Sequence, residues 1–321
     1  MNKNDLKIVF LGTPDFAVES LKRIHESGYN VVGVITMPDK PAGRGHKMLS
    51  SPVKKYAEAN GLNLMQPPKL KDPEFVEQLR SLEADLFIVI AFRMLPEMVW
   101  TMPRLGTFNL HASLLPKYRG AAPINWAVIN GDSETGVTTF FLKHEIDTGD
   151  IIDRQSVEIK PDENVGDVHD KLMMLGADLT IKTIESILDG TLHTTPQKEL
   201  TGDAEPTPAP KIFKDTCRID WNQPSVKIHN LVRGLSPYPA AWSTMFDDDK
   251  EIGDVKIFET EVIENFAPAT PGTMHVTASD SIIVNCGEGA IRIKSLQIPG
   301  KRRMDTAEYL KGARLSSPRF A

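Results

Sequence analysis

Apolar runs of strand length alternate with helical patterns over the first part of the chain, and this alternation limits the folds that the chain can adopt. Three such runs are LKIVFLG at 6–12, NVVGVIT at 30–36 and DLFIVIAF at 85–92. The last is apolar at nearly every position, which is typical of a strand covered on both faces. Helical spacing after the first run, from Ala17 to Ile24, indicates a crossover helix. The sequence therefore predicts an α/β fold with a mainly parallel sheet.

The pattern changes after a helix predicted at 165–189. Residues 191–210, TLHTTPQKELTGDAEPTPAP, are rich in Thr and Pro and predict a semi-extended connector. Beyond them, one helical stripe precedes short strand-like runs such as SIIVNC and AIRIKSLQI, which favour a small β-rich barrel or sandwich. We therefore expect a first domain at 1–190, a linker at 191–210 and a second domain at 211–321.

The composition excludes several classes of protein. Of the 321 residues, 40% are hydrophobic and 25% are charged, as in an ordinary globular protein. No run of about 18 apolar residues occurs and no apolar signal core precedes the first strand, so we expect a cytoplasmic protein without a membrane span. Cys217 and Cys286 stand far apart and outside any C-x-x-C motif, which favours buried thiols over a disulfide or a zinc site.

The charge is distributed unevenly along the chain. A formal net charge of -6 argues weakly against a nucleic-acid partner. Between Ala290 and Ala321, however, eight Lys or Arg residues accompany two acidic residues. Because phosphate binding depends on the local field, this segment is either a solvated surface or a site for a polyanion. The loop PAGRGHK at 41–47 also has two interpretations, a mobile surface loop or a basic probe with Arg44 at its tip.

Side chains suited to catalysis follow the predicted strand in FNLHASLLP. Asn109 and His111 share one side of a strand because strand side chains alternate, and ligands bind beyond the carboxyl ends of such strands. An amide donor beside an imidazole suits the stabilisation of an oxyanion. Asp147, in the later turn DTGD, can orient the imidazole. The alternative is structural, with Asn109 capping a turn, His111 satisfied in the core and Asp147 making turn hydrogen bonds.

Other familiar site patterns do not fit the sequence. GTPDFAV, after the first strand, has one glycine where a dinucleotide fingerprint needs three, and PAGRGHK lacks the spacing of a P-loop. Ser113 is not part of a G-x-S-x-G motif, which disfavours an acyl-serine mechanism. His144 and Asp147 lack an evident third ligand, so we expect no metal site.

HASLLPKYRGAAP, followed by DTGDI, resembles the signature of formyltetrahydrofolate-dependent formyltransferases. FLGTPDFAV, MPDKPAGRGHKMLSSPVK, RIDW and SLQIPGKRRM are similar to the methionyl-tRNA formyltransferase family among them. The resemblance runs from Lys7 to about Gly312, and AFRMLP (Ala91 to Pro96) departs from the Gly-containing form common there. It implies a Rossmann-like, mainly parallel formyltransferase domain followed by a smaller β-rich, barrel-like (OB-like) domain.

The resemblance also implies a reaction and the residues that perform it. The formyl group would pass from 10-formyltetrahydrofolate, without a metal, to the amino group of methionyl initiator tRNA by direct amine attack. The implied catalytic residues are Asn109, His111 and Asp147, and the implied tetrahydrofolate site is Ser113, Leu114, Leu115 and Pro116. We expect tRNA to be bound by Arg44, Lys47, Lys301, Arg302 and Arg303.

Related functions would use the same three catalytic candidates. They are a formyltransferase acting on a sugar-nucleotide amine or on glycinamide ribonucleotide, and a 10-formyltetrahydrofolate hydrolase. The length of the chain disfavours the glycinamide enzyme, and the basic loop and tail have no clear purpose in a sugar enzyme. From a different class, a catalytically silent tRNA-binding module is disfavoured because Asn109, His111 and Asp147 are all present.

Overall fold

A computed structural model of the chain describes residues 2–42, 47–201, 205–277 and 280–321. The chain divides into two compact units, each assembled from three segments. The first unit consists of Met1–Gly120, Gly136–Val157 and His169–Pro208, and the second of Ala121–Thr135, Glu158–Val168 and Ala209–Ala321. The second unit therefore combines the C-terminal part of the chain with two short segments from earlier in the sequence.

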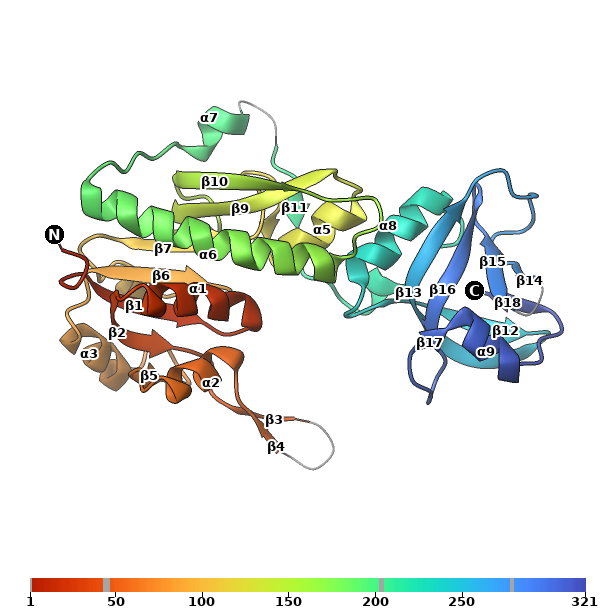
Figure 1. Cartoon of the computed structure of the whole chain (residues 1–321), viewed down its shortest axis with the longest axis horizontal. Coiled ribbons are helices and arrows are strands. Elements are labelled where there is room, and N and C mark those ends of the chain that lie inside the picture. Colours follow the sequence, from red (N-terminus) through yellow and green to blue (C-terminus); the bar gives the residue numbers. More distant parts are fainter. Residues whose placement is uncertain (1, 43–46, 202–204, 278–279) are drawn as a thin grey trace. The chain divides into compact units, whose positions relative to one another are not determined.

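A seven-stranded sheet forms the centre of the first unit (Figure 1). In sheet order its strands are β10 (Ile151–Glu158), β9 (Glu134–Phe141), β7 (Thr107–His111), β6 (Leu86–Ile90), β1 (Lys7–Gly12), β2 (Asn30–Ile35) and β5 (Leu64–Met65). Pairing is parallel from β5 through β2, β1 and β6 to β7, and β9 pairs antiparallel with β7. The prediction of a mainly parallel α/β sheet is confirmed.

Helices cover both faces of this sheet. Those of the first unit are α1 (Asp15–Glu26), α2 (Pro52–Ala59), α3 (Pro73–Ser81), α4 (Glu97–Trp100), α6 (Val165–Asp189) and α7 (Gln197–Thr201). A Cβ at Gly176 of α6 would lie 2.6 Å from Leu110 Cδ2 of β7, so α6 packs closely on the face to which Leu110 points. On the opposite face, side chains of β1 and β6 form a buried cluster with α3 and α4.

Capping residues explain where two of these helices begin. The side chain of Ser51 accepts a hydrogen bond from Lys54 N ahead of α2, and that of Asp72 accepts one from Glu74 N ahead of α3. Each helix has Pro in its first turn, where the missing N–H costs nothing. Shorter strands are β3 (Lys40–Ala42) and β4 (Lys47–Leu49), which pair antiparallel, and β8 (Arg119–Gly120) and β11 (Pro208–Ala209).

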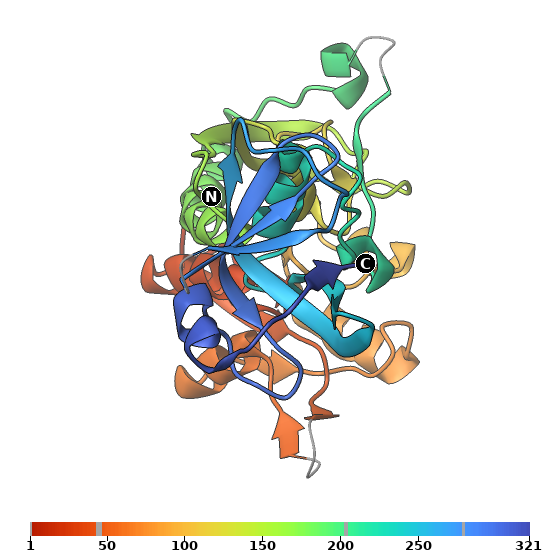
Figure 2. The same cartoon turned by 90° about the vertical axis from the view of Figure 1, so that its right-hand side faces the viewer.

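An antiparallel sheet curves around a common interior in the second unit (Figure 2). Its order is β14 (Met274–Thr277), β15 (Ser281–Asn285), β16 (Ala290–Gln297), β13 (Lys250–Ile263), β12 (Ala241–Asp247) and β18 (Pro318–Phe320), with β17 (Met304–Asp305) beside β16. A bridge between Thr273 and Arg319 and a 2.9 Å bond from Phe320 N to Gly272 O link the two ends of the sheet. The prediction of a barrel-like second domain is confirmed.

Short helices accompany the barrel. They are α5 (Pro123–Ile129), the 3-10 helix η1 (Asp215–Cys217), α8 (Ser225–Leu235) and α9 (Thr306–Gly312). Cys217 and Cys286 are buried and free, as the sequence predicts, and burial raises the pKa of the Cys286 thiol to about 12. Within the described parts of the chain, no helix combines the length and the hydropathy that a membrane crossing requires.

Candidate active site

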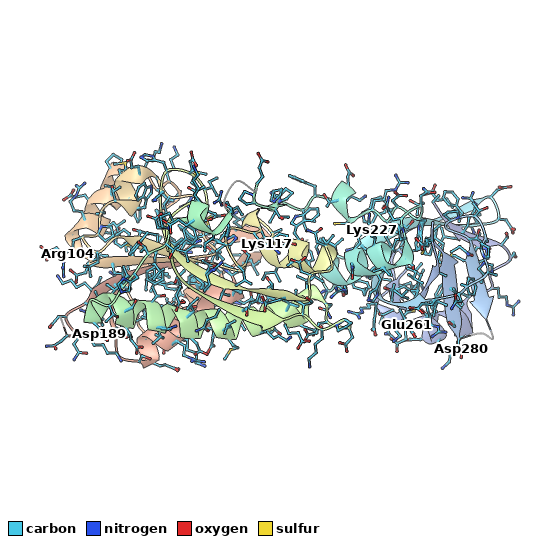
Figure 3. The ribbon with its side chains drawn as sticks, turned by 90° about the horizontal axis from the view of Figure 1, so that it is seen from above. Arg104, Lys117, Asp189, Lys227, Glu261 and Asp280 are labelled. Atoms are coloured by element: carbon cyan, nitrogen blue, oxygen red, sulfur yellow. The ribbon has the colours of Figure 1, made fainter. Side chains whose placement is uncertain are left out.

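The candidate site begins at the carboxyl end of β7. Figure 3 labels Arg104, which precedes this strand, and Lys117, which follows it, and the site lies at the Lys117 end. Asn109 and His111 point to the same face of the sheet, opposite to Leu110, because they are two positions apart. The strand therefore places both side chains on the same face, near its carboxyl end, as the alternation of strand side chains predicts.

The His111 ring is buried and held through one nitrogen. Its Nε2 lies 2.8 Å from the carbonyl oxygen of Tyr118. Because a carbonyl only accepts, Nε2 must carry a proton. Its Nδ1 faces Asp147 Oδ2 at 3.8 Å, which is an ion-pair distance when the ring is protonated but too long for a hydrogen bond. Nδ1 is therefore the nitrogen that remains available for a ligand.

Asp147 lies on the turn between β9 and β10. It adopts a positive φ of 55°, and its Oδ2 accepts a 3.0 Å hydrogen bond from Gly120 N. The turn is tight, since a Cβ at Gly149 would lie 1.6 Å from Phe141 O. The structure thus brings Asp147 near His111 although 35 residues separate them in the sequence.

The Asn109 side chain differs from those of His111 and Asp147 because it has no hydrogen-bond partner among the residues that the structure describes. It is partly buried, and within the described residues its amide forms no hydrogen bond. The strand pairs it with Val89 of β6 and Phe140 of β9, both apolar. Within the described residues the Asn109 amide therefore caps no turn and joins no protein hydrogen-bond network, which leaves it able to bind a ligand.

The turn after β7 carries the predicted folate residues and is internally bonded. The Ser113 hydroxyl donates to Lys117 O at 2.7 Å, and the Thr138 hydroxyl donates to Ser113 O at 2.6 Å while accepting from Leu115 N at 3.1 Å. Leu115 and Pro116 are buried, and Leu114 is partly exposed. The hydroxyl of Ser113 therefore shapes the turn, and Leu114 is the member of this group that offers apolar surface.

The segment AFRMLP, which differs from the Gly-containing form common in the family, follows β6. Because β6 and β7 are parallel neighbours, it leaves the sheet at the same edge as the residues that follow β7. Ala91 adopts a positive φ of 47°. Arg93 Nη1 donates to Pro68 O at 2.9 Å, Nη2 donates to Pro67 O, and Nε is buried without a partner among the described residues. Burial lowers the pKa of the Arg93 guanidinium. The segment is thus fixed by main-chain acceptors rather than by an acidic side chain.

The predicted tRNA residues belong to other parts of the chain. Arg44 lies outside the described residues, and of Lys47 only the backbone, in β4, is described. In the second unit, the guanidinium of Arg302 is paired with Glu308. Arg303 Nε donates to Ser295 Oγ at 2.8 Å, and its guanidinium lies 4.7 Å from the Phe258 ring centroid. All three residues from 301 to 303 are exposed.

Sequence reasoning did not single out three groups that hold the site together. Tyr118 O and Gly120 N, which bind His111 and Asp147, are backbone atoms of the KYRG motif. Gln197 donates to the backbone of the Asp147 turn. Periodicity gives no signal for Gln197, which lies in the Thr/Pro-rich stretch. No group of three His, Cys, Asp or Glu residues is placed to hold a metal ion in the part of the chain that the structure describes.

Comparisons with known proteins cover almost the whole chain. The family model Formyl transferase matches residues 6–184, and the model Formyl transferase, C-terminal domain, matches residues 211–314. Methionyl-tRNA formyltransferase of Bacteroides fragilis is 58% identical over 316 residues, which are 98% of each chain. The protein of the same name from Porphyromonas gingivalis is 47% identical over 322 residues, covering 100% of this chain and 99% of that one.

Solved structures share the fold at lower identity. The N-formyltransferase from Helicobacter canadensis, in complex with folinic acid and dTDP-3-aminofucose, has a TM-score of 0.67 and 21% identity, covering 90% of this chain and 98% of that one. HypX from Aquifex aeolicus in complex with tetrahydrofolic acid has a TM-score of 0.64 and 19% identity. That match covers 97% of this chain and 48% of HypX, so the chain spans about half the length of HypX.

Proposed function

The chain belongs to the formyl transferase family, and we propose that it transfers a formyl group from a folate donor to the amino group of methionyl-tRNA. The observation that carries this proposal is the Asn109 amide, which forms no hydrogen bond within the described residues and lies on the same face of β7 as His111, whose Nδ1 faces Asp147 Oδ2 at 3.8 Å. Relatives that are 58% identical over 98% of the chain are methionyl-tRNA formyltransferases. We infer that the donor is 10-formyltetrahydrofolate and that the acceptor is the initiator form of the tRNA.

Features of the turn after β7 support a folate site there. A flat pterin needs apolar surface on its faces and hydrogen-bonding groups at its edges. Leu114 provides partly exposed apolar surface, and the main chain of the turn is held in place by Thr138 and by Arg154, whose Nη1 donates to Leu115 O at 3.0 Å. We propose that Ser113, Leu114, Leu115 and Pro116 line the tetrahydrofolate site, where the folate supplies the formyl group.

The chemistry is a direct attack by an amine on the formyl carbon. A bond forms between the amino nitrogen and that carbon, and the bond from the carbon to the folate nitrogen breaks. Negative charge develops on the formyl oxygen, and two donors can stabilise it, Asn109 Nδ2 and a protonated His111 Nδ1. Asp147 balances the charge of the imidazolium and helps to move the proton of the amino group to the departing nitrogen. No covalent enzyme intermediate is required.

The parts of the chain are proposed to have different roles in this reaction. We propose that residues 1–190 form the catalytic domain, that 191–210 are a linker and that 211–321 form a tRNA-binding domain. Arg44 and Lys47 are proposed to contact the tRNA from the first domain, and Lys301, Arg302 and Arg303 from the second. The exposure of residues 301–303 supports this role, since phosphate contacts require accessible cations.

One assay separates this function from its alternatives. The protein is incubated with 10-formyltetrahydrofolate and, in parallel, with methionyl-tRNA, an amino-sugar nucleotide, glycinamide ribonucleotide or buffer alone. We expect N-formylmethionyl-tRNA in the first reaction and no product above background in the others. If methionyl-tRNA is not formylated while the sugar nucleotide or glycinamide ribonucleotide is, or while formate is released in buffer alone, methionyl-tRNA is rejected as the acceptor.

A further inference from the structure

Gln197 is a buried polar residue within the connector, where the surrounding sequence is rich in Thr and Pro. It is the first residue of α7 and is only 3% exposed. The residue two positions before it, Thr195, exchanges two backbone hydrogen bonds with Ile151 at the start of β10, at 2.8 and 2.9 Å. The segment is therefore docked against the strand that follows the Asp147 turn, and Gln197 is brought to the turn itself.

The amide nitrogen of Gln197 spans this turn. Nε2 donates to Asp147 O at 2.8 Å and to Gly149 O at 2.9 Å, so both amide protons are used. The two bonds fix the backbone on either side of Thr148, including the residue that carries the proposed catalytic carboxylate. A buried amide with every proton satisfied holds its acceptors in one geometry.

The amide oxygen of Gln197 is held by Arg119. Oε1 accepts from Arg119 Nε at 3.0 Å and from Nη2 at 2.7 Å. Because arginine only donates and backbone carbonyls only accept, these contacts leave one possible orientation for the amide. The neighbour of Arg119 is Gly120, whose N–H donates to Asp147 Oδ2.

These contacts form a closed ring around Asp147. Gln197 binds the backbone of Asp147 on one side and Arg119 on the other, and Gly120 returns to the Asp147 carboxylate. Tyr118, the residue before Arg119, accepts from His111 Nε2. The three consecutive residues at 118–120 therefore position the imidazole, the Gln197 amide and the carboxylate relative to one another.

We propose that Gln197 is a positioning residue for formyl transfer, which sets the Asp147 carboxylate against His111 Nδ1. The proposal rests on the proposed function of this site. It assigns the connector a role in catalysis besides joining two domains. Glutamine suits the position because it offers two protons to the turn and an acceptor to Arg119. Glutamate would place an oxygen against two carbonyls, and methionine would keep the size but make none of the bonds.

The first test is the Gln197→Met variant, with Glu199→Gln, an exposed substitution on the same helix, as its control. Misplacing a catalytic group by a fraction of an ångström to 1 Å costs up to about a hundredfold in rate. We expect kcat for formylation of methionyl-tRNA to fall about tenfold to a hundredfold in Gln197→Met. KM for both substrates should stay within about twofold, and Glu199→Gln should match the wild type.

The second test asks whether Gln197 acts through Asp147. In an Asp147→Asn background, Gln197→Met should lower kcat by less than about threefold, because the group that it positions no longer carries a charge. Gln197→Glu retains the contact with Arg119. Its effect on kcat should likewise be smaller in the Asp147→Asn background than in the presence of Asp147. Should Gln197→Met fail to fold, the cycle with Gln197→Glu decides the question.

Two results would overturn the proposal. One is a kcat equal to that of the wild type in both Gln197 variants. The other is a decrease in kcat on substitution of Gln197 that has the same size with Asp and with Asn at position 147, which would indicate a general structural role. A different result, in which the wild-type protein fails to formylate methionyl-tRNA, would reject the proposed function rather than the positioning role.

Discussion

At the scale of single residues, two of the three candidate catalytic side chains are hydrogen-bonded to the protein backbone, and the third has no hydrogen bond within the described residues. His111 Nε2 is bound to Tyr118 O and Asp147 Oδ2 to Gly120 N, while the Asn109 amide has no partner among the described residues. Removing Asn109 therefore leaves no broken protein hydrogen bond. Its contribution should appear in catalysis and not in stability.

Replacing Asn109 with Ala should lower kcat for formyl transfer roughly a hundredfold or more, because one donor to the developing oxyanion is lost. The melting temperature should stay within about 2 °C, since no internal bond is removed. Asn63→Ala, which removes an exposed hydrogen bond to Val32 O, is the matched control and should leave kcat unchanged. Turnover near the wild-type level in Asn109→Ala would remove this residue from the mechanism.

At the scale of elements, close backbone approaches fix the turn between β9 and β10. A Cβ at Gly149 would meet Phe141 O at 1.6 Å, and one at Gly136 of β9 would meet Gln155 O at 2.1 Å. Both oxygens that the added carbon would meet belong to the backbone, so a change of side-chain rotamer cannot relieve the clash. The turn that carries Asp147 therefore depends on the small size of Gly149, and the close approach of β9 and β10 depends on that of Gly136.

Gly149→Ala should lower the free energy of unfolding by about 1–3 kcal/mol, the usual cost of overpacking, and should also lower kcat because the turn moves. Urea unfolding and steady-state kinetics measure the two effects. Gly312→Ala is the control, since nothing lies within 4 Å of a Cβ at that position. A Gly149→Ala protein with unchanged stability and turnover would show that the backbone here is more adaptable than the structure indicates.

A second element, the β3–β4 hairpin, is anchored at its base by Asp39. This carboxylate accepts from Lys54 Nζ at 2.6 Å and from Gln66 Nε2 at 3.0 Å, and these bonds, that of Lys54 foremost, lower the pKa of Asp39. A lowered pKa in the folded state stabilises the fold above the unfolded pKa of about 3.9, and this contribution is lost as the pH falls through the folded-state pKa.

Asp39→Asn should therefore lower the free energy of unfolding at pH 7, and its difference from the wild type should shrink as the pH is lowered below about 4. Urea titrations of both proteins between pH 7 and pH 3 provide the measurement. A difference that remains constant over this range would show that the charge of Asp39 does not contribute to stability.

How far the sequence predicts these elements depends on the range of the interactions that form them. β1 and β6 are found from local apolar runs, and the rim position of Asn109 and His111 follows from strand alternation. The two-residue strand β5 gives no comparable signal. The bonds of Gln197 to Asp147 and Arg119 join segments 50 and 78 positions apart. They depend on backbone placement, which no local pattern encodes.

At the scale of the whole molecule, a protein with a formal net charge of -6 is proposed to bind a polyanion. The local distribution resolves this contrast, because Lys301, Arg302 and Arg303 are exposed together. Their environments differ, since Arg302 pairs with Glu308 and Arg303 stacks on Phe258. Lys301 has no side-chain partner within the described residues, so its charge is the most available of the three.

Lys301→Ala should weaken tRNA binding and reduce the slope of log K against log salt by about one, as expected for the loss of one phosphate contact. KM for the folate donor should not change. Lys250→Ala, an exposed lysine at the start of β13, is the control. An unchanged affinity and salt slope in Lys301→Ala would place the tRNA contacts elsewhere in the chain.

The central claim is that Asn109, His111 and Asp147 act together on one formyl group. It is tested most directly by the single-turnover rate of formyl transfer from 10-formyltetrahydrofolate to methionyl initiator tRNA in a His111→Gln variant, whose amide can still donate to Tyr118 O. At saturating concentrations of both substrates, we predict a rate at least about a hundredfold below that of the wild type, with the dissociation constants of both substrates unchanged. Transfer within about threefold of the wild-type rate would contradict the assignment of this site as the catalytic centre.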